Sequence, residues 1–156
     1  MDVLGPIFAI FGGLMFVLLA IGAASSILLS LGLYKMAVDR GLEYPFVAWI
    51  PLGQFYIMAE LVGEITLSGN EIPYLKFVLP GTLVFAWLIP HIGFIGTLAF
   101  LALIVPTVWK LAEMYQGNPM ATVICFLIVP VVGEYMIYAL SKNEPIEIEE
   151  SSFSLS

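Results

Sequence analysis

The most prominent pattern in the chain is a pair of long runs without any charged side chain. The first run covers residues 3–34 and the second covers residues 77–109. As an α-helix, the first run would be roughly 48 Å long, whereas the hydrocarbon core of a bilayer is about 30 Å thick. Runs of this kind are typical of integral membrane proteins, so we expect the lipid bilayer to surround most of this chain.

Proline and glycine residues divide the apolar sequence into five helical segments. We expect helices over about residues 6–36, 46–62, 73–89, 92–116 and 120–140, because Pro and Gly disfavour the helix interior between them. The sequence therefore predicts an all-α fold: an integral membrane helical bundle in which four or five segments span the membrane.

The basic residues lie near the ends of these segments and leave two topologies open. If all five segments cross, Lys35, Arg40 and Lys142 lie opposite Lys76 and Lys110. If the second segment instead dips into the membrane and returns, four of these cations share one side and Lys142 is alone on the other. Because cytoplasmic loops carry an excess of cations, the second arrangement is favoured, with both termini outside.

The composition agrees with a single membrane domain. Of the 156 residues, 61% are hydrophobic and only 11% are charged, whereas soluble domains contain about 25% charged residues. We expect residues 1–140 to form one transmembrane helical domain and the acidic residues 141–156 to form a disordered tail. The net charge of −7, with only five Lys and Arg, argues against nucleic acid as a partner.

One short sequence pattern recurs in three places. It consists of a β-branched residue, a proline, a glycine two or three positions later and then an aromatic residue, and it covers residues 50–55, 89–94 and 129–135. A longer similarity relates residues 34–37 to residues 109–112. Each of these segments is followed by a proline and then by an apolar run that leads into the pattern. Because duplicated membrane proteins often contain such broken helices, the pattern predicts an internal repeat. The alternative is that Pro and Gly are frequent in membrane helices.

The segments that carry this pattern resemble a family of small bacterial membrane domains of unknown function. The family has Trp-Lys before a Gly-containing turn and then Trp-Ala-Ala-Leu-Ile-Pro-Ile-Tyr-Asn, and its members sometimes occur alongside signal peptidase I. Here the similar features are Trp109-Lys110 and the segment WIPLGQFY at residues 49–56, with Gln54 at the family's Asn position. The resemblance covers about residues 33–140. It implies a polytopic protein of a bacterial cell membrane and no particular activity.

Polar side chains inside the apolar segments are the candidates for an intramembrane site. Glu134 lies roughly 10 Å inside the end of its segment, where a carboxylate is costly and usually faces the protein interior. Gln54 occupies the matching place after the first pattern, Glu60 lies one to two turns further on, and His91 lies within the second pattern. The alternative is that these residues only hold helices or turns together.

Small residues on the first segment form a candidate surface for helix packing. Gly22, Ser26 and Ser30 follow one another at intervals of four residues, which places them on one helix face. In lipid, such a face permits close approach of a second helix. The alternative is that these are ordinary small residues of a membrane helix.

The chain lacks the residue sets of familiar membrane enzymes. Its single histidine excludes a His-Glu-x-x-His zinc site, and its two aspartates, Asp2 and Asp39, lie outside the predicted spans. Cys125 has no second cysteine with which to pair and is interpreted as a packing residue. We therefore expect no catalytic, metal or cofactor-binding residue, and an enzyme is the least favoured class.

Two other function classes remain. The first is a non-enzymatic accessory, assembly or protective protein that acts through helix–helix contacts with a membrane protein partner or a second copy. The second is a small transporter or channel that uses Glu134 at the broken helices. A water-filled cavity that joins Glu134 to Gln54 and Glu60 would favour transport, and a buried interhelical hydrogen bond would favour the accessory role.

Overall fold

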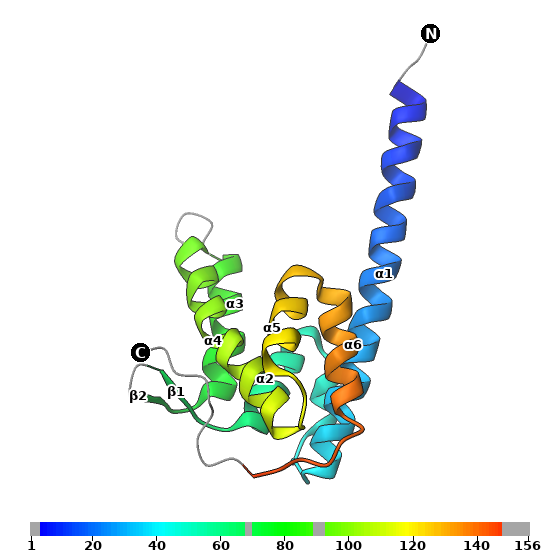
Figure 1. Ribbon diagram of the computed structural model, residues 1–156. Coiled ribbons are helices and arrows are strands. Elements are labelled where there is room, and N and C mark those ends of the chain that lie inside the picture. The colour runs from blue at the N-terminus through cyan, green and yellow to red at the C-terminus, as the bar shows by residue number, and fades with distance from the viewer. Residues whose placement is uncertain (1–3, 68–69, 89–92, 148–156) are drawn as a thin grey trace.

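The chain is almost entirely helical in the computed structural model, which describes residues 4–67, 70–88 and 93–147 (Figure 1). The described elements are α1 (Leu4–Asp39), the 3-10 helix η1 (Pro45–Trp49), α2 (Pro51–Val62), β1 (Ile65–Leu67), β2 (Asn70–Ile72), α3 (Leu75–Leu88), α4 (Gly93–Met114), α5 (Pro119–Ile128) and α6 (Pro130–Leu140). The prediction of an all-α fold is confirmed, apart from the small antiparallel hairpin in which β1 pairs with β2.

The predicted single helix over residues 120–140 is wrong, because the chain turns back at Val129 and forms α5 and α6 instead. Pro130 cannot continue a helix, since its ring clashes with the preceding turn, but it suits the first position of a new one. The segment over residues 46–62 is divided in the same way, with η1 before Ile50 and α2 starting at Pro51. Proline therefore begins the returning helix in both places.

A glycine allows the two arms of each helical turn-back to touch. A Cβ on Gly53 would overlap the backbone of η1, one on Gly133 would overlap the Cα of Phe126, and one on Gly93 would lie 2.5 Å from the carbonyl oxygen of Ala86. Figure 1 shows α3 beside α4 and α5 beside α6 as antiparallel pairs. These glycines belong to the three recurring patterns, although residues 89–92 of the second pattern lie outside the described residues.

The C-terminal ends of α1 and α4 are hydrogen-bonded alike. The Leu42 N–H donates to the Ala37 carbonyl over 2.9 Å, and the Gly117 N–H donates to the Ala112 carbonyl over 2.7 Å. In each case the residue before the donor is left-handed, with φ of 68° after α1 and 57° after α4. This combination is the Schellman arrangement that ends many helices. These two helix ends follow residues 34–37 and 109–112, the segments of the longer sequence similarity.

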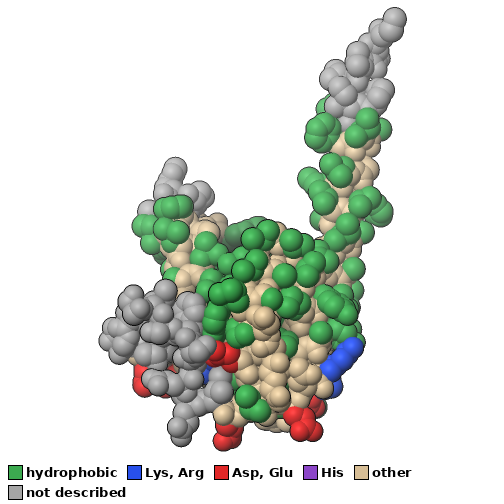
Figure 2. All heavy atoms as spheres, in the orientation of Figure 1, with side chains coloured by type: hydrophobic (Ala, Val, Ile, Leu, Met, Phe, Trp, Pro, Cys, Tyr) green, Lys and Arg blue, Asp and Glu red, His purple; other side chains and the backbone are tan. Residues whose placement is uncertain are grey.

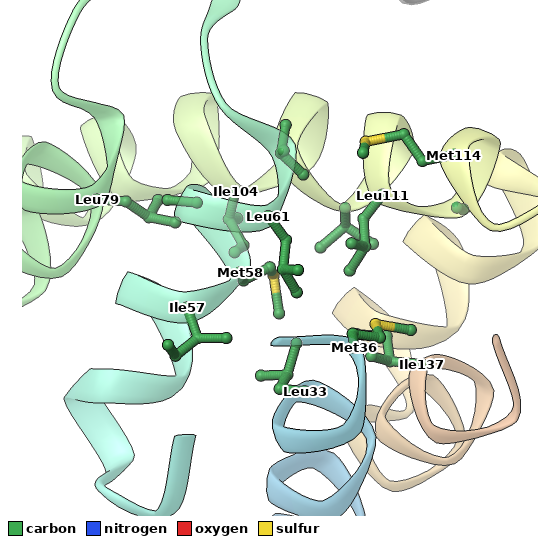
Figure 3. Packing of buried hydrophobic residues seen from close by; sticks show 14 of the residues in the cluster. Leu33, Met36, Ile57, Met58, Leu61, Leu79, Ile104, Leu111, Met114 and Ile137 are labelled. Carbon is green, nitrogen blue, oxygen red and sulfur yellow. The ribbon is translucent and has the colours of Figure 1, made fainter. Parts of the chain in front are cut away.

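The hydrophobic core lies where the C-terminal half of α1 meets α2, α4 and α6. Figure 3 shows Leu33 and Met36 of α1 facing Met58, Leu111 and Ile137, all of which are fully buried. The core therefore joins residues from both halves of the sequence.

The N-terminal half of α1 stands clear of this bundle (Figures 1 and 2). Every large hydrophobic side chain from Phe8 to Ile21 is at least 45% exposed, on all sides of the helix. A helix that is apolar all round is suited to lipid rather than to water. Among the described residues, α1 and α4 are long and apolar enough to cross a membrane.

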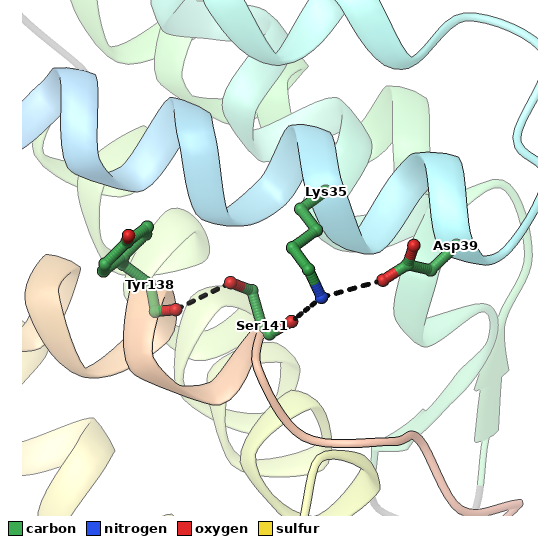
Figure 4. Close-up of polar contacts among 4 residues, drawn as sticks. All are labelled: Lys35, Asp39, Tyr138 and Ser141. Atoms are coloured by element: carbon green, nitrogen blue, oxygen red, sulfur yellow. Dashed lines mark hydrogen bonds and ion pairs between the residues drawn. The ribbon is translucent and has the colours of Figure 1, made fainter.

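The charged residues gather at the opposite end of the bundle (Figure 2). Lys35 donates to the Asp39 carboxylate over 3.0 Å and also to the backbone carbonyl of Ser141, which joins α1 to the end of α6 (Figure 4). Lys142 therefore lies at the same end as Lys35, so the expectation that it stands alone on the other side is wrong. Near the other end of the described chain, the Ile146 N–H donates to the Met114 carbonyl at the C-terminal end of α4, whereas Leu4 begins α1 at the end away from Lys35 and Asp39.

Candidate functional site

Two of the predicted residue sets meet in one buried contact between α1 and α2. The Gln54 Nε2 donates to the Ser30 hydroxyl over 2.9 Å and to the Ser26 hydroxyl over 3.0 Å. Ser30 in turn donates to the Ser26 carbonyl over 2.9 Å. Gln54 and Ser30 are 6% and 3% exposed, so both N–H groups of the amide are used away from the surface. This geometry ties the two helices together.

Local sequence explains why these side chains meet. Pro51 sets the start of α2, so Gln54 lies one turn inside the returning helix and faces α1. Ser26 and Ser30 are one turn apart on α1 and present both hydroxyls to the same amide. Hydrogen bonds between membrane helices are worth about 0.6–2 kcal/mol each.

Gly22, the third residue of the predicted packing face, takes no part in this contact within the described chain, and its role in helix packing stays a prediction. A Cβ on Gly22 would meet nothing within 4 Å. The reason is that α2 starts only at Pro51, one turn before the Gln54 that meets Ser26, so α2 does not reach the level of Gly22. From Gly22 toward its N-terminus, α1 is exposed with respect to the described part of the chain.

The close approach of α1 to α6 uses Gly32, a residue that sequence reasoning missed. A Cβ on Gly32 would lie 2.8 Å from the Cα of Tyr138, so the missing side chain lets α1 and α6 touch. A glycine inside a helix destabilises it by about 1 kcal/mol relative to alanine. A glycine inside the predicted first helix therefore indicates a packing role, and this was the sequence feature that could have identified Gly32.

Glu60, a second residue of the candidate intramembrane site, does not contact Gln54. Its carboxylate is paired with the Lys76 ammonium at 2.8 Å, and that ammonium also lies 5.7 Å from the ring centres of Tyr56 and Phe77. The pair borders an open cavity of about 250 Å³ at the charged end, lined by Ala59, Glu60, Gly63, Glu64, Tyr74, Leu75 and Lys76. Glu60 is therefore part of the interfacial charge network.

Glu134 is half-buried on α6 and stands apart from both residues. Its Oε2 is buried and has no hydrogen-bond partner within residues 4–67, 70–88 and 93–147. It makes no hydrogen bond to Gln54, whose side-chain contacts are to α1. The fourth residue predicted for this site, His91, lies outside the described residues.

Tyr115 is a second buried polar group, at the turn between α4 and α5. Its side chain is 1% exposed, and its hydroxyl has no hydrogen-bond partner of ordinary geometry in the described part of the chain. Burial raises the pKa of this phenol, and the nearby Arg40 guanidinium opposes that shift.

The described residues contain no group of three His, Cys, Asp or Glu side chains that could hold a metal ion.

The chain matches no family model, no curated protein and no solved structure. The resemblance stated for residues 33–140 therefore stays a prediction.

Proposed function

We propose that this protein is a non-enzymatic accessory protein of a bacterial cell membrane that acts through helix–helix contact with a membrane protein partner. The observation that carries the proposal is the N-terminal half of α1, which has no neighbour within the described chain. The main polar groups of the bundle support it, because Gln54 and Glu60 have partners inside the chain.

The surface suited to a partner is a ridge of small residues on that free half. Gly5, Ala9 and Gly13 are exposed and follow at intervals of four, so they share one helix face. A Cβ on Gly5 or Gly13 would meet nothing within 4 Å. Such a ridge allows the backbone of a second transmembrane helix to come close, in a partner protein or in a second copy of this chain.

Photo-crosslinking in cells tests this role. A photoreactive amino acid in place of Phe16, which is 73% exposed, should form a protein adduct of discrete mass. Gly13→Ile should abolish the adduct by blocking close approach. Gly22→Ile is the matched control, since Gly22 is equally open and lies about half a turn away around the helix. Crosslinks to lipid alone, or equal effects of both substitutions, would refute the proposed surface.

We also propose that α1–η1–α2 and α4–α5–α6 are two copies of one unit. The support is the shared Schellman end, the proline that begins each returning helix and the glycine at each turn-back. If each unit folds as a module, co-expressed fragments 1–72 and 73–156 should assemble into a stable complex. Degradation of both fragments would contradict modular units.

The second candidate is the small transporter or channel, favoured by the unpartnered Glu134 oxygen inside the bundle. Ionisable side chains inside membrane segments often mark ion pathways. Purified protein in liposomes should conduct no protons or alkali cations under the accessory role. A flux that Glu134→Gln abolishes would establish transport instead.

A further inference from the structure

Two of the helical hairpins, η1–α2 and α5–α6, are too short to cross a bilayer. α5 and α6 contain 10 and 11 residues, and α2 contains 12. At the rise of an α-helix these arms are about 15–18 Å long, which is close to half of the roughly 30 Å hydrocarbon core. An arm of that length that starts at one interface ends near the midplane.

Both ends of α5–α6 lie at the charged end of the bundle. The Asn143 side-chain amide, just after α6, donates to the Tyr115 carbonyl over 2.8 Å, just before α5. The Ile146 N–H donates to the Met114 carbonyl over 2.7 Å. Since α6 returns to the level at which α5 started, the hairpin enters and leaves on one side.

Both ends of η1–α2 also lie at the charged end of the bundle. The Tyr44 hydroxyl, just before η1, donates to the exposed Glu43 carboxylate over 2.9 Å. Beyond α2, the Lys110 ammonium donates to the Glu64 carbonyl over 2.7 Å, which places that end beside the base of α4. All these groups belong to the charged end.

The tips of the two hairpins are apolar and exposed. Ile50 is 52% exposed and Ile128 is 74% exposed, and their neighbours Leu52, Val129, Val131 and Val132 are also exposed. Exposed side chains of this kind at both tips indicate contact with hydrocarbon.

The tip backbone is suited to a medium without water. The Val129 N–H donates to the Cys125 carbonyl, the Gly133 N–H donates to the Val129 carbonyl, and Pro130 has no N–H to satisfy. At the other tip, the Ile50 N–H donates into η1 and the Ile50 carbonyl accepts from the Gln54 N–H. Chain turns inside a bilayer need such internal pairing.

We propose that η1–α2 and α5–α6 are re-entrant hairpins that enter from the charged side, turn near the membrane midplane and return. Acyl chains of the opposite leaflet fill the space above their tips, beside the Gly22 face of α1. The protein then occupies more area in the leaflet of the charged side than in the other leaflet.

Two native tryptophans report the depth directly. Trp49 is the last residue of η1, next to the tip, and is 49% exposed, whereas Trp109 lies near the base of α4. Single-tryptophan proteins are made by replacing the other two tryptophans with Phe. They are reconstituted in phosphatidylcholine vesicles brominated either near the headgroup or deep in the acyl chain.

Trp49 should be quenched at least twofold more by deep bromine than by shallow bromine, and Trp109 should show the opposite order. If the second segment instead crosses the membrane, Trp49 lies near the headgroups and shallow bromine quenches it better, which overturns the proposal. Absence of quenching of Trp49 at either depth would mean that protein rather than lipid covers the tip, and would also overturn it.

Sidedness supplies an independent measurement. In a Cys125→Ala background, single cysteines replace Glu43, Glu71 and Glu144, all of which are exposed. A membrane-impermeant maleimide should label all three from the same side of sealed, uniformly oriented vesicles. Labelling of the Glu71 position from the other side indicates five spans, and labelling of the Glu144 position from the other side indicates four; either result contradicts re-entrant hairpins.

Discussion

The Gln54 Nε2 lies 2.9 Å from the Ser30 hydroxyl oxygen, across the interface between α1 and α2. The contact joins a residue from the predicted polar site to a residue from the predicted packing face. The N–H groups of this amide are used between the two helices, and such an interhelical hydrogen bond is the observation that the accessory role predicts.

Gln54→Leu should lower the free energy of unfolding by about 1–2 kcal/mol, because it leaves the Ser26 and Ser30 hydroxyls without this partner. A double-mutant cycle with Ser30→Ala should give a coupling energy of about 0.5–1.5 kcal/mol in detergent micelles. Thr97→Val is the control, since the Thr97 hydroxyl bonds only its own helix at Gly93. A Gln54–Ser30 coupling no larger than the Gln54–Thr97 coupling would contradict the contact.

Gly133→Ala should destabilise the protein by about 1–3 kcal/mol or more, because the added Cβ overlaps the backbone of Phe126 and forces α5 and α6 apart. Thermal unfolding in micelles measures the effect. Gly22→Ala, which meets nothing within 4 Å, should be neutral or slightly stabilising, since alanine favours a helix. Equal melting temperatures for the two variants would mean that the hairpin arms do not touch.

The first part of the acidic tail should contribute to stability, although residues 141–156 are expected from the sequence to be largely disordered. Deleting residues 143–156 removes the Asn143–Tyr115, Gln116–Glu144 and Ile146–Met114 hydrogen bonds and should cost about 2–3 kcal/mol. Deleting only residues 148–156, which lie outside the described residues, should leave the melting temperature unchanged. If both truncations melt alike, these hydrogen bonds do not contribute.

Tyr115 should make the protein less stable at alkaline pH. Burial raises the pKa of its phenol in the folded state, so above about pH 10 the unfolded chain loses this proton while the folded chain keeps it. The free energy of unfolding should therefore fall as pH rises through that range. Tyr115→Phe should remove this part of the pH dependence and stay within about 1 kcal/mol of the wild type at pH 7, since it deletes a buried hydroxyl without a hydrogen bond.

Tyr44→Phe is the comparison for that titration. The pKa of Tyr44 is also raised, by its hydrogen bond to the Glu43 carboxylate, but its side chain is exposed and the solvent screens the effect. Tyr44→Phe should therefore change the free energy of unfolding at alkaline pH less than Tyr115→Phe does. The opposite order would show that burial of Tyr115 is not the dominant cause.

The sequence by itself determined the helical class and the places where helices end. The uncharged run over residues 3–34 predicts α1 closely, because in lipid a helix satisfies its own backbone hydrogen bonds. The second run, residues 77–109, is divided by its Pro-Gly pattern into the segments of α3 and α4. The three Pro-Gly patterns marked the turns, since Pro removes a hydrogen-bond donor and Gly removes a side chain wherever they occur. These are local effects, so a local pattern reveals them.

Only the tertiary structure decided which way the chain continues after each turn and which side chains meet. A proline ends one helix and begins another whether the second continues across the membrane or folds back, and the contact of Gly133 with Phe126 selects the fold-back. Glu60 and Gln54 lie six residues apart on one helix, yet one pairs with Lys76 and the other with Ser30. Such partners depend on how distant segments pack, and that information is absent from any single stretch of sequence.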